Sequence, residues 1–130
     1  MLNPVRRIVE LLAGRHLELP HELLQRHPDL AGVRWRRGGL PPRVGGWALG
    51  QRSVLGITLG KTVFLAPHAA LSPALLLHEL AHVHQFERDV AFPVRYLWES
   101  LRRGYRRNRF EFEADSYASS RLSRPPSGAR

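Results

Sequence analysis

The apolar residues near the start of the chain recur at the helical spacing i, i+3, i+4 and i+7, at Val5, Ile8, Val9 and Leu12. Pro4 precedes them and suits the first position of a helix, because the N–H that proline lacks has no partner there. The pattern predicts an amphipathic helix over residues 4–12. A short helical turn is predicted over residues 20–26.

Three more helices are predicted in the second half of the chain. Ser72 and Pro73 can cap and open a helix that runs to Phe86. Pro93 opens the next helix, which Gly104 can end. The apolar stripe of this helix is expected to cover the preceding helix and consists of Val94, Leu97, Trp98 and Leu101. Its polar side is expected to face solvent and consists of Arg95, Glu99 and Arg102. Asn108 can cap a last helix that reaches about Ser120.

Between these helices the pattern is typical of β-structure. Residues 33–35 are predicted to be extended, and the glycines and prolines of residues 36–43 predict a loop. Strands are predicted over residues 47–49, 53–59 and 61–66, with a tight turn at Gly60 and Lys61, which suggests a small antiparallel meander. The expected fold class is α+β and zincin-like, with a small antiparallel or mixed sheet packed on the helix that follows Ser72.

Length and composition limit the number of domains, the possible metal ligands and the expected localisation. At 130 residues the chain suits one domain, expected over residues 1–122 with its motifs within about 44–121, and residues 123–130 suit a disordered tail. Cysteine is absent, so a tightly bound metal must use His, Asp or Glu. The first 20 residues lack the apolar core of a signal peptide, and no transmembrane segment is predicted, so we expect a cytoplasmic protein.

The chain is strongly basic, with 20 Lys and Arg against 11 Asp and Glu, a net charge of +9. Lys61 is the single lysine. An excess of arginine can serve nucleic acids or anionic surfaces. Nucleic acid is a candidate partner, but a solvated basic surface without such a role is favoured.

The predicted helix after Ser72 contains the motif HExxH, at His78, Glu79 and His82. Histidines four residues apart share a helix face with Cβ atoms roughly 6 Å apart, so both imidazoles can bind one zinc ion at about 2.0 Å. Glu79 can then act as the general base for a metal-activated water. This pattern predicts a zinc metallopeptidase.

A catalytic zinc site needs a third protein ligand. In one subclass of zinc peptidases, the metzincins, a glycine and a further histidine follow this motif. The present chain has Gln85 and Arg88 at those positions, which excludes the subclass. Of the downstream carboxylates, Glu111 and Asp115 share one helix face, whereas Glu113 points away from it. The other acidic candidates are Glu87, Asp89 and Glu99. Glu111 is the preferred ligand, with Asp115 orienting a liganding histidine, and a rival role for Glu111 is to cap the helix start at Asn108.

These two motifs resemble those of the gluzincin metallopeptidases, in which HExxH is followed on a later helix by ExxxD. Residues around both motifs look like the small bacterial zincins and the catalytic part of HtpX-like and CAAX-prenyl proteases, and are similar to repressor-cleaving bacterial peptidases. The resemblance covers roughly residues 44–121. It implies a polypeptide substrate, bound as an added β-strand along part of Lys61 to Ala66. The membrane helices of HtpX-like enzymes are missing from this sequence.

Further residues have a plain structural interpretation beside a functional one. Tyr105 and Tyr117 are candidate oxyanion donors, but packing is the favoured interpretation of both. His68 is a remote candidate for an additional ligand, and His84 lies about 200° around the helix from His82 and should not share its ion.

Two alternatives to the peptidase stay open. One is a catalytically inactive, zinc-stabilised domain, because a metal can supplement a small core. The other is a protease or binding module that contacts nucleic acid through the arginines near Glu111. A membrane-surface role for residues 92–98 beside these arginines ranks lowest, since their apolar stripe is expected to be covered.

Overall fold

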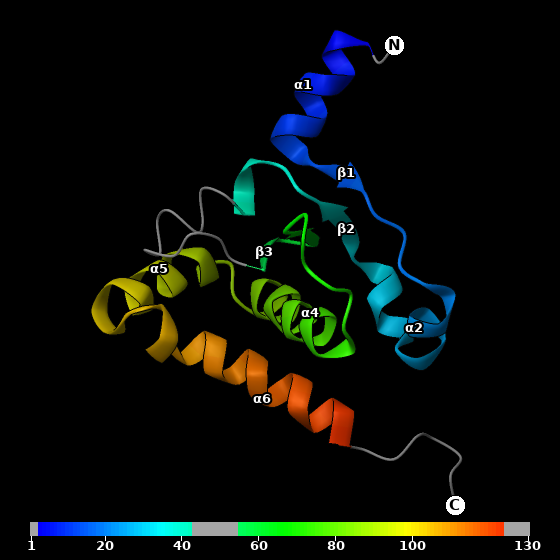
Figure 1. The fold of residues 1–130 in the computed structure, drawn as a ribbon. Helices are drawn as coiled ribbons and strands as arrows, with labels where there is room; N and C mark the ends of the chain where they lie inside the picture. The colour runs from blue at the N-terminus through cyan, green and yellow to red at the C-terminus, as the bar shows by residue number, and fades with distance from the viewer. Residues whose placement is uncertain (1–2, 43–54, 124–130) are drawn as a thin grey trace, which may run out of the picture. The chain divides into compact units, whose positions relative to one another are not determined.

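A computed structural model of the chain describes residues 3–42 and 55–123, except for the side chain of Tyr105. The chain divides into two compact units, Met1–Ala70 and Leu71–Arg130, which are described separately. The first holds the sheet and the second holds three helices and both motifs (Figure 1). The predicted α+β class is confirmed, while the single domain over residues 1–122 stays a prediction.

The first unit begins with the predicted amphipathic helix, α1 (Pro4–Ala13). Asn3 caps it, since its side-chain oxygen accepts a hydrogen bond from the N–H of Val5 at 3.0 Å. Gly14 ends it with φ +69°, and a Cβ at this position would lie 2.6 Å from the carbonyl oxygen of Arg37. Only glycine fits here, because it adopts positive φ freely and carries no side chain.

A four-stranded mixed sheet follows, in the order β1 (Arg15–His16), β2 (Arg34–Arg37), β4 (Thr62–Leu65) and β3 (Gly56–Leu59). β3 and β4 form the predicted antiparallel hairpin around Gly60, and β1 is antiparallel to β2. β2 and β4, however, are parallel. The antiparallel pairing predicted for residues 53–59 and 61–66 is therefore confirmed, and β2, which overlaps the extended piece predicted at residues 33–35, makes the sheet a mixed one.

The position of β4 corrects the proposed mode of substrate binding. β4 lies inside the sheet, with β2 hydrogen-bonded along one edge and β3 along the other. Residues 61–66 therefore offer no open edge to an added strand. Among the described strands, β1 and β3 are the edge strands. The strand predicted at residues 47–49 and most of the tail predicted at residues 123–130 lie outside the described residues.

Two short helical segments, α2 (His21–Arg26) and η1 (Pro28–Gly32), connect β1 to β2. Trp35 is buried on β2, and its indole N–H donates to the carbonyl of Leu30 at 2.9 Å. Leu30, Val63 and Leu65 are fully buried. These side chains are the apolar core residues that the first unit contributes.

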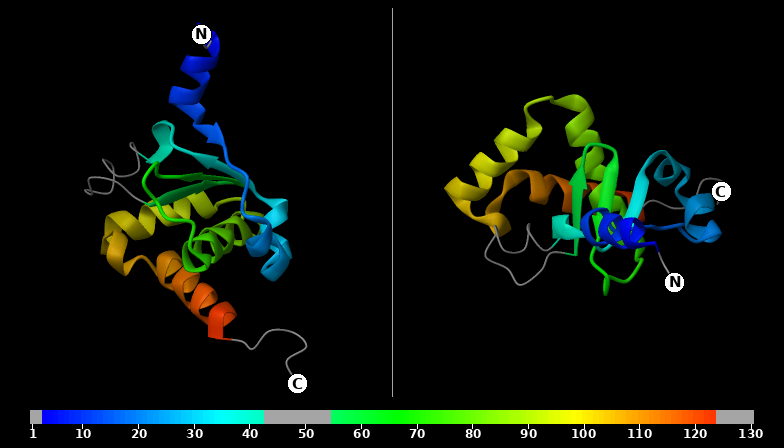
Figure 2. Two further views of the ribbon diagram at one scale, coloured as in Figure 1. Left: turned by 45° about the vertical axis from the view of Figure 1, so that its right-hand side comes forward. Right: turned by 90° about the horizontal axis from the view of Figure 1, so that it is seen from above.

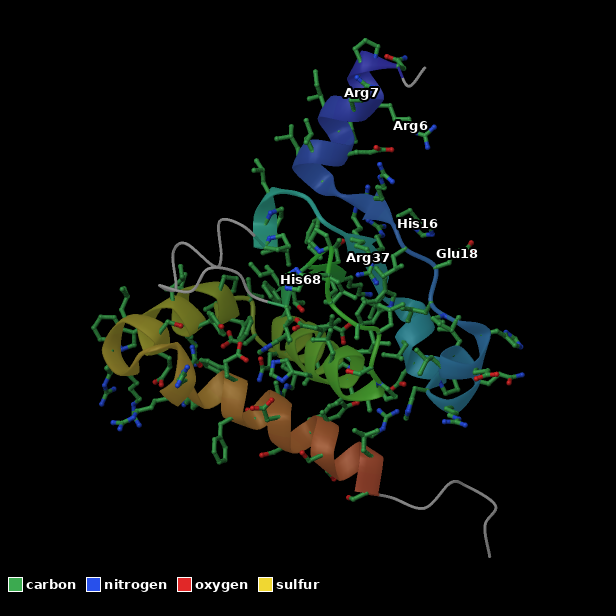
Figure 3. All side chains as sticks on the ribbon, viewed as in Figure 1. Arg6, Arg7, His16, Glu18, Arg37 and His68 are labelled. Atoms are coloured by element: carbon green, nitrogen blue, oxygen red, sulfur yellow. The ribbon has the colours of Figure 1, made fainter. Side chains whose placement is uncertain are left out.

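Arg37 and the loop after β4 are joined by hydrogen bonds. The guanidinium of Arg37 donates through Nη1 to the carbonyls of Ala66, Pro67 and Ala69 at 3.2, 3.1 and 2.9 Å (Figure 3). These bonds satisfy backbone acceptors that are not part of the sheet. His68 is exposed in the same loop.

The second unit contains α4 (Pro73–Arg88), α5 (Phe92–Arg103) and α6 (Arg109–Ser123), with a short η2 (Tyr105–Arg107) between the last two. α4 and α6 lie side by side, and α5 leads away from the end of α4 (Figure 2). All three helices were predicted. Among the described residues, no helix has both the length and the apolar character needed to cross a membrane.

The ends of these helices follow the predicted caps. The hydroxyl of Ser72 accepts from the N–H of Leu75 at 3.2 Å, and the side-chain oxygen of Asn108 accepts from the N–H of Phe110 at 2.9 Å. The amide nitrogen of the fully buried Asn108 also donates to the carbonyl of Tyr96 and the hydroxyl of Ser100. Asn108 thus joins the start of α6 to α5.

The predicted orientation of α5 was wrong. Its stripe residues are exposed, whereas Glu99, expected to face solvent, is only 7% exposed. The interior face of α5 carries Phe92 and Tyr96, whose rings lie 5.1 and 6.5 Å from the ring of Phe110. These aromatic contacts and the bonds from Asn108 hold that face inward. A helical period shows which residues share a face, but not which face is covered.

Candidate metal centre

Three side chains with metal-binding atoms meet between α4 and α6: His78, His82 and Glu111. Their ligand atoms all lie within 4.8 Å of one another. The Nε2 atoms of the two histidines are 3.2 Å apart, and Glu111 Oε2 and Oε1 lie 2.9 and 3.1 Å from Nε2 of His78 and His82. The group could hold one metal ion. The α-helix provides the histidine pair, and the contact of α4 with α6 brings the carboxylate to it.

The outer nitrogens of both histidines are held by acceptors. Nδ1 of His78 lies 2.7 Å from a carboxylate oxygen of Asp115, and Nδ1 of His82 lies 2.7 Å from the side-chain oxygen of Gln85. The amide nitrogen of Gln85 donates to the carbonyl of Phe110, which leaves its oxygen free to accept. Both Nδ1 atoms therefore carry protons, and in the neutral rings both lone pairs lie on Nε2.

The lone pairs of two Nε2 atoms that face each other at 3.2 Å repel unless a positive charge lies near them. Protonation supplies that charge when no metal is bound. Burial by itself lowers the pKa of His78, but its hydrogen bond to Glu111 and the charges of Glu79, Glu111 and Asp115 outweigh burial and raise the pKa to about 9. For His82, burial is likewise outweighed by Glu111 and Glu79, so its pKa is raised. A cation at this position would replace these protons.

The opposite shift occurs at Glu111. Burial acts to raise its pKa, but hydrogen bonds from His78, His82 and Tyr96 dominate and lower the pKa well below its usual range. Its side chain is 12% exposed. Both carboxylate oxygens of Glu111 face these donors. At the start of α6, where Glu111 had a rival role as a cap, the side chain of Asn108 caps the N–H of Phe110. Glu111 is therefore ionised at neutral pH, as a metal ligand must be.

Glu79, the middle residue of the motif, is buried with 4% of its surface exposed. Its charge raises the pKa of both neighbouring histidines. This carboxylate therefore lies within electrostatic reach of the group but is not one of the three ligand candidates.

Sequence reasoning missed two residues at this site. Tyr96 on α5 donates its hydroxyl hydrogen bond to Glu111 Oε1 at 2.7 Å, and Gln85 orients His82. The sequence position of each residue could have indicated its role. Gln85 stands three residues after His82 on the same helix, and Tyr96 stands opposite the apolar stripe of its helix. Tyr96 was missed because α5 was expected to face the other way.

The other predicted residues lie as follows. The hydroxyl of Tyr117 accepts from Arg121 at 2.6 Å, and its ring lies edge-on to His84 at 5.6 Å. Glu113 pairs with Arg88 at the surface, on a different face from Glu111. The side chain of Tyr105 lies outside the described part of the chain.

Comparison with known proteins gave no match for this chain, either among family models or among curated proteins and solved structures.

Proposed function

We propose that the chain is a zinc-dependent peptidase of the gluzincin type, with a zincin-like arrangement of its motif-bearing helices. The observation that carries this proposal is the meeting of His78 and His82 with Glu111, with both Nε2 atoms turned inward. The chain order also supports it, because HExxH lies on α4 and Glu111 and Asp115 lie on the later helix α6.

The donor set fits zinc. Two imidazole nitrogens and one carboxylate form the His2Glu set of several catalytic zinc sites. Asp115 and Gln85 supply the partners that metal-binding histidines usually have at the other ring nitrogen. Zinc bound here would act as a Lewis acid that polarises a peptide carbonyl and lowers the pKa of water.

The remaining chemistry falls to the chain's own residues. Glu79 takes a proton from the attacking water and returns it to the leaving amine. Tyr96 holds Glu111 in place by its hydrogen bond, and Asp115 fixes the ring of His78. The substrate class is a polypeptide.

The variant Glu79→Gln tests this function, since glutamine keeps the size of the side chain but cannot accept the proton. We expect it to bind one equivalent of zinc and to lose cleavage of a peptide library by at least about a hundredfold. Glu87→Gln, at an exposed position on the same helix, is the matched control and should cleave normally. Undiminished cleavage by Glu79→Gln would refute the proposal.

The burial of the site favours a second candidate, a zinc-stabilised domain without activity. The side chains of His78, His82 and Glu111 are 16, 7 and 12% exposed, so an ion held by them would be part of the interior and could supplement the small core of the second unit. This candidate predicts that chelation unfolds the second unit, measured by circular dichroism, and that no peptide in the library is cleaved with zinc present.

A further inference from the structure

The outward face of α5 is a continuous apolar stripe. Val94, Leu97, Trp98 and Leu101 are 70, 58, 62 and 83% exposed and lie at i, i+3, i+4 and i+7. Scattered exposed leucines are common on protein surfaces, but a helical row of four that includes a tryptophan is not. We define these four residues as the α5 stripe.

The α5 stripe cannot be the face of α5 that packs against the rest of the second unit, because the opposite face already makes those contacts. Phe92 and Glu99 are buried there. Tyr96 is bonded to Glu111, and Asn108 donates to the carbonyl of Tyr96. Turning the stripe inward would break these bonds and expose the carboxylate of Glu99. The stripe is therefore available to a partner.

Arginines lie beside the stripe on α5 and in the segment that follows this helix. The segment from Phe92 to Arg109 holds six arginines and one glutamate, a net charge of +5. Three of them, Arg102, Arg106 and Arg107, are exposed and form no ion pair with any described residue. A partner that covers the stripe must therefore be apolar where it meets the stripe and negatively charged beside it.

We propose that α5 docks on an anionic membrane surface. The α5 stripe enters the boundary between headgroups and acyl chains, where tryptophan is favoured, and the arginines bind lipid phosphates and carboxylates. A second copy of the chain would bring two segments of charge +5 together, which opposes pairing. A nucleic acid duplex would satisfy the arginines but leave the leucines in water. This surface does not depend on the proposed peptidase activity.

The other exposed amphipathic helix, α1, offers a comparison. Its apolar residues, Ile8 and Leu12 among them, are also exposed. However, α1 has no aromatic residue, and Glu10 pairs with Arg6 at 3.2 Å and with Arg15 at 3.4 Å. Fewer free cations remain there for an anionic surface, so α5 is the stronger candidate.

Co-sedimentation of the full chain with vesicles tests the proposal. The vesicles consist of phosphatidylcholine alone or of phosphatidylcholine with phosphatidylserine. We expect binding to the anionic vesicles only, weakened by rising salt. The variant Leu97→Ser/Leu101→Ser should weaken binding at least about tenfold, and Arg102→Gln/Arg106→Gln/Arg107→Gln by up to about a hundredfold.

Two double variants serve as controls. Leu59→Ser/Leu122→Ser removes two exposed leucines from other elements and should bind as wild type does. Binding that survives the α5 variants but is lost in Ile8→Ser/Leu12→Ser would overturn the assignment to α5. Equal binding to both kinds of vesicle, no binding to either, or a dimer in analytical ultracentrifugation that only Leu97→Ser/Leu101→Ser abolishes would overturn it as well.

Discussion

Replacing Glu111 with alanine removes the carboxylate on which both the metal centre and the metal-free protein depend. Without metal, the pKa of His78 stands at about 9 instead of its ordinary 6.5. This difference corresponds to about 3 kcal/mol of stabilisation. Glu111 is the partner that hydrogen-bonds His78, and Glu79 and Asp115 add their charges. We therefore expect Glu111→Ala to lower the free energy of unfolding by about 2 kcal/mol at about pH 6.

The pH dependence of this loss follows from the sign of the shift. A pKa raised by folding gives stabilisation that is fully present below the unfolded value and disappears as pH rises through the folded value. The stabilisation that protonated His78 gives to the folded protein should therefore be complete below pH 6.5 and vanish above about pH 9. Urea unfolding of chelator-treated protein at several pH values measures it. Because folding lowers the pKa of Glu111, its share of the stabilisation is lost as pH falls below its ordinary value of 4.5. Wild type and Glu111→Ala should therefore differ most between pH 4.5 and 6.5 and converge in base.

Metal content gives the second readout of the same variant. Wild type should bind one equivalent of zinc, and Glu111→Ala should bind more than about a hundredfold more weakly. The matched control is Glu113→Ala, two residues away, which removes a surface pair with Arg88 and should cost at most about 1 kcal/mol. Equal zinc in all three proteins would exclude Glu111 as a ligand, and equal stability at pH 6 would refute the electrostatic argument.

Three further predictions follow from the same contacts. Tyr96→Phe should weaken zinc binding roughly tenfold in calorimetry because Glu111 loses a donor, while Tyr117→Phe should not change it. Asp115→Asn should weaken zinc binding about 10–100-fold, because the ring of His78 loses a charged partner; an unchanged affinity would contradict that role. Zinc affinity, measured by competition with a chelator, should rise at least about tenfold per pH unit between pH 6 and 8, because His78 must lose its proton first, and a flat profile would show that no proton is displaced.

Local patterns predicted most of the elements. Pro4, Ser72 and Asn108 marked helix starts correctly, because caps and first-turn prolines act within a few residues of themselves. The hairpin around Gly60 was predicted for the same reason. The parallel pairing of β2 with β4 was not, since it joins strands separated by a long connection.

The sequence alone determined that His78 and His82 share one face of a helix, because four residues make about one helical turn. It also placed Glu111 and Asp115 on a common face of a later helix. Tertiary structure alone decided that these two faces meet, that Gln85 and Tyr96 complete the arrangement, and that the α5 stripe points to solvent. The reason is physical: periodicity defines the faces of one helix, whereas the pairing of faces depends on how whole helices pack, which no local pattern records.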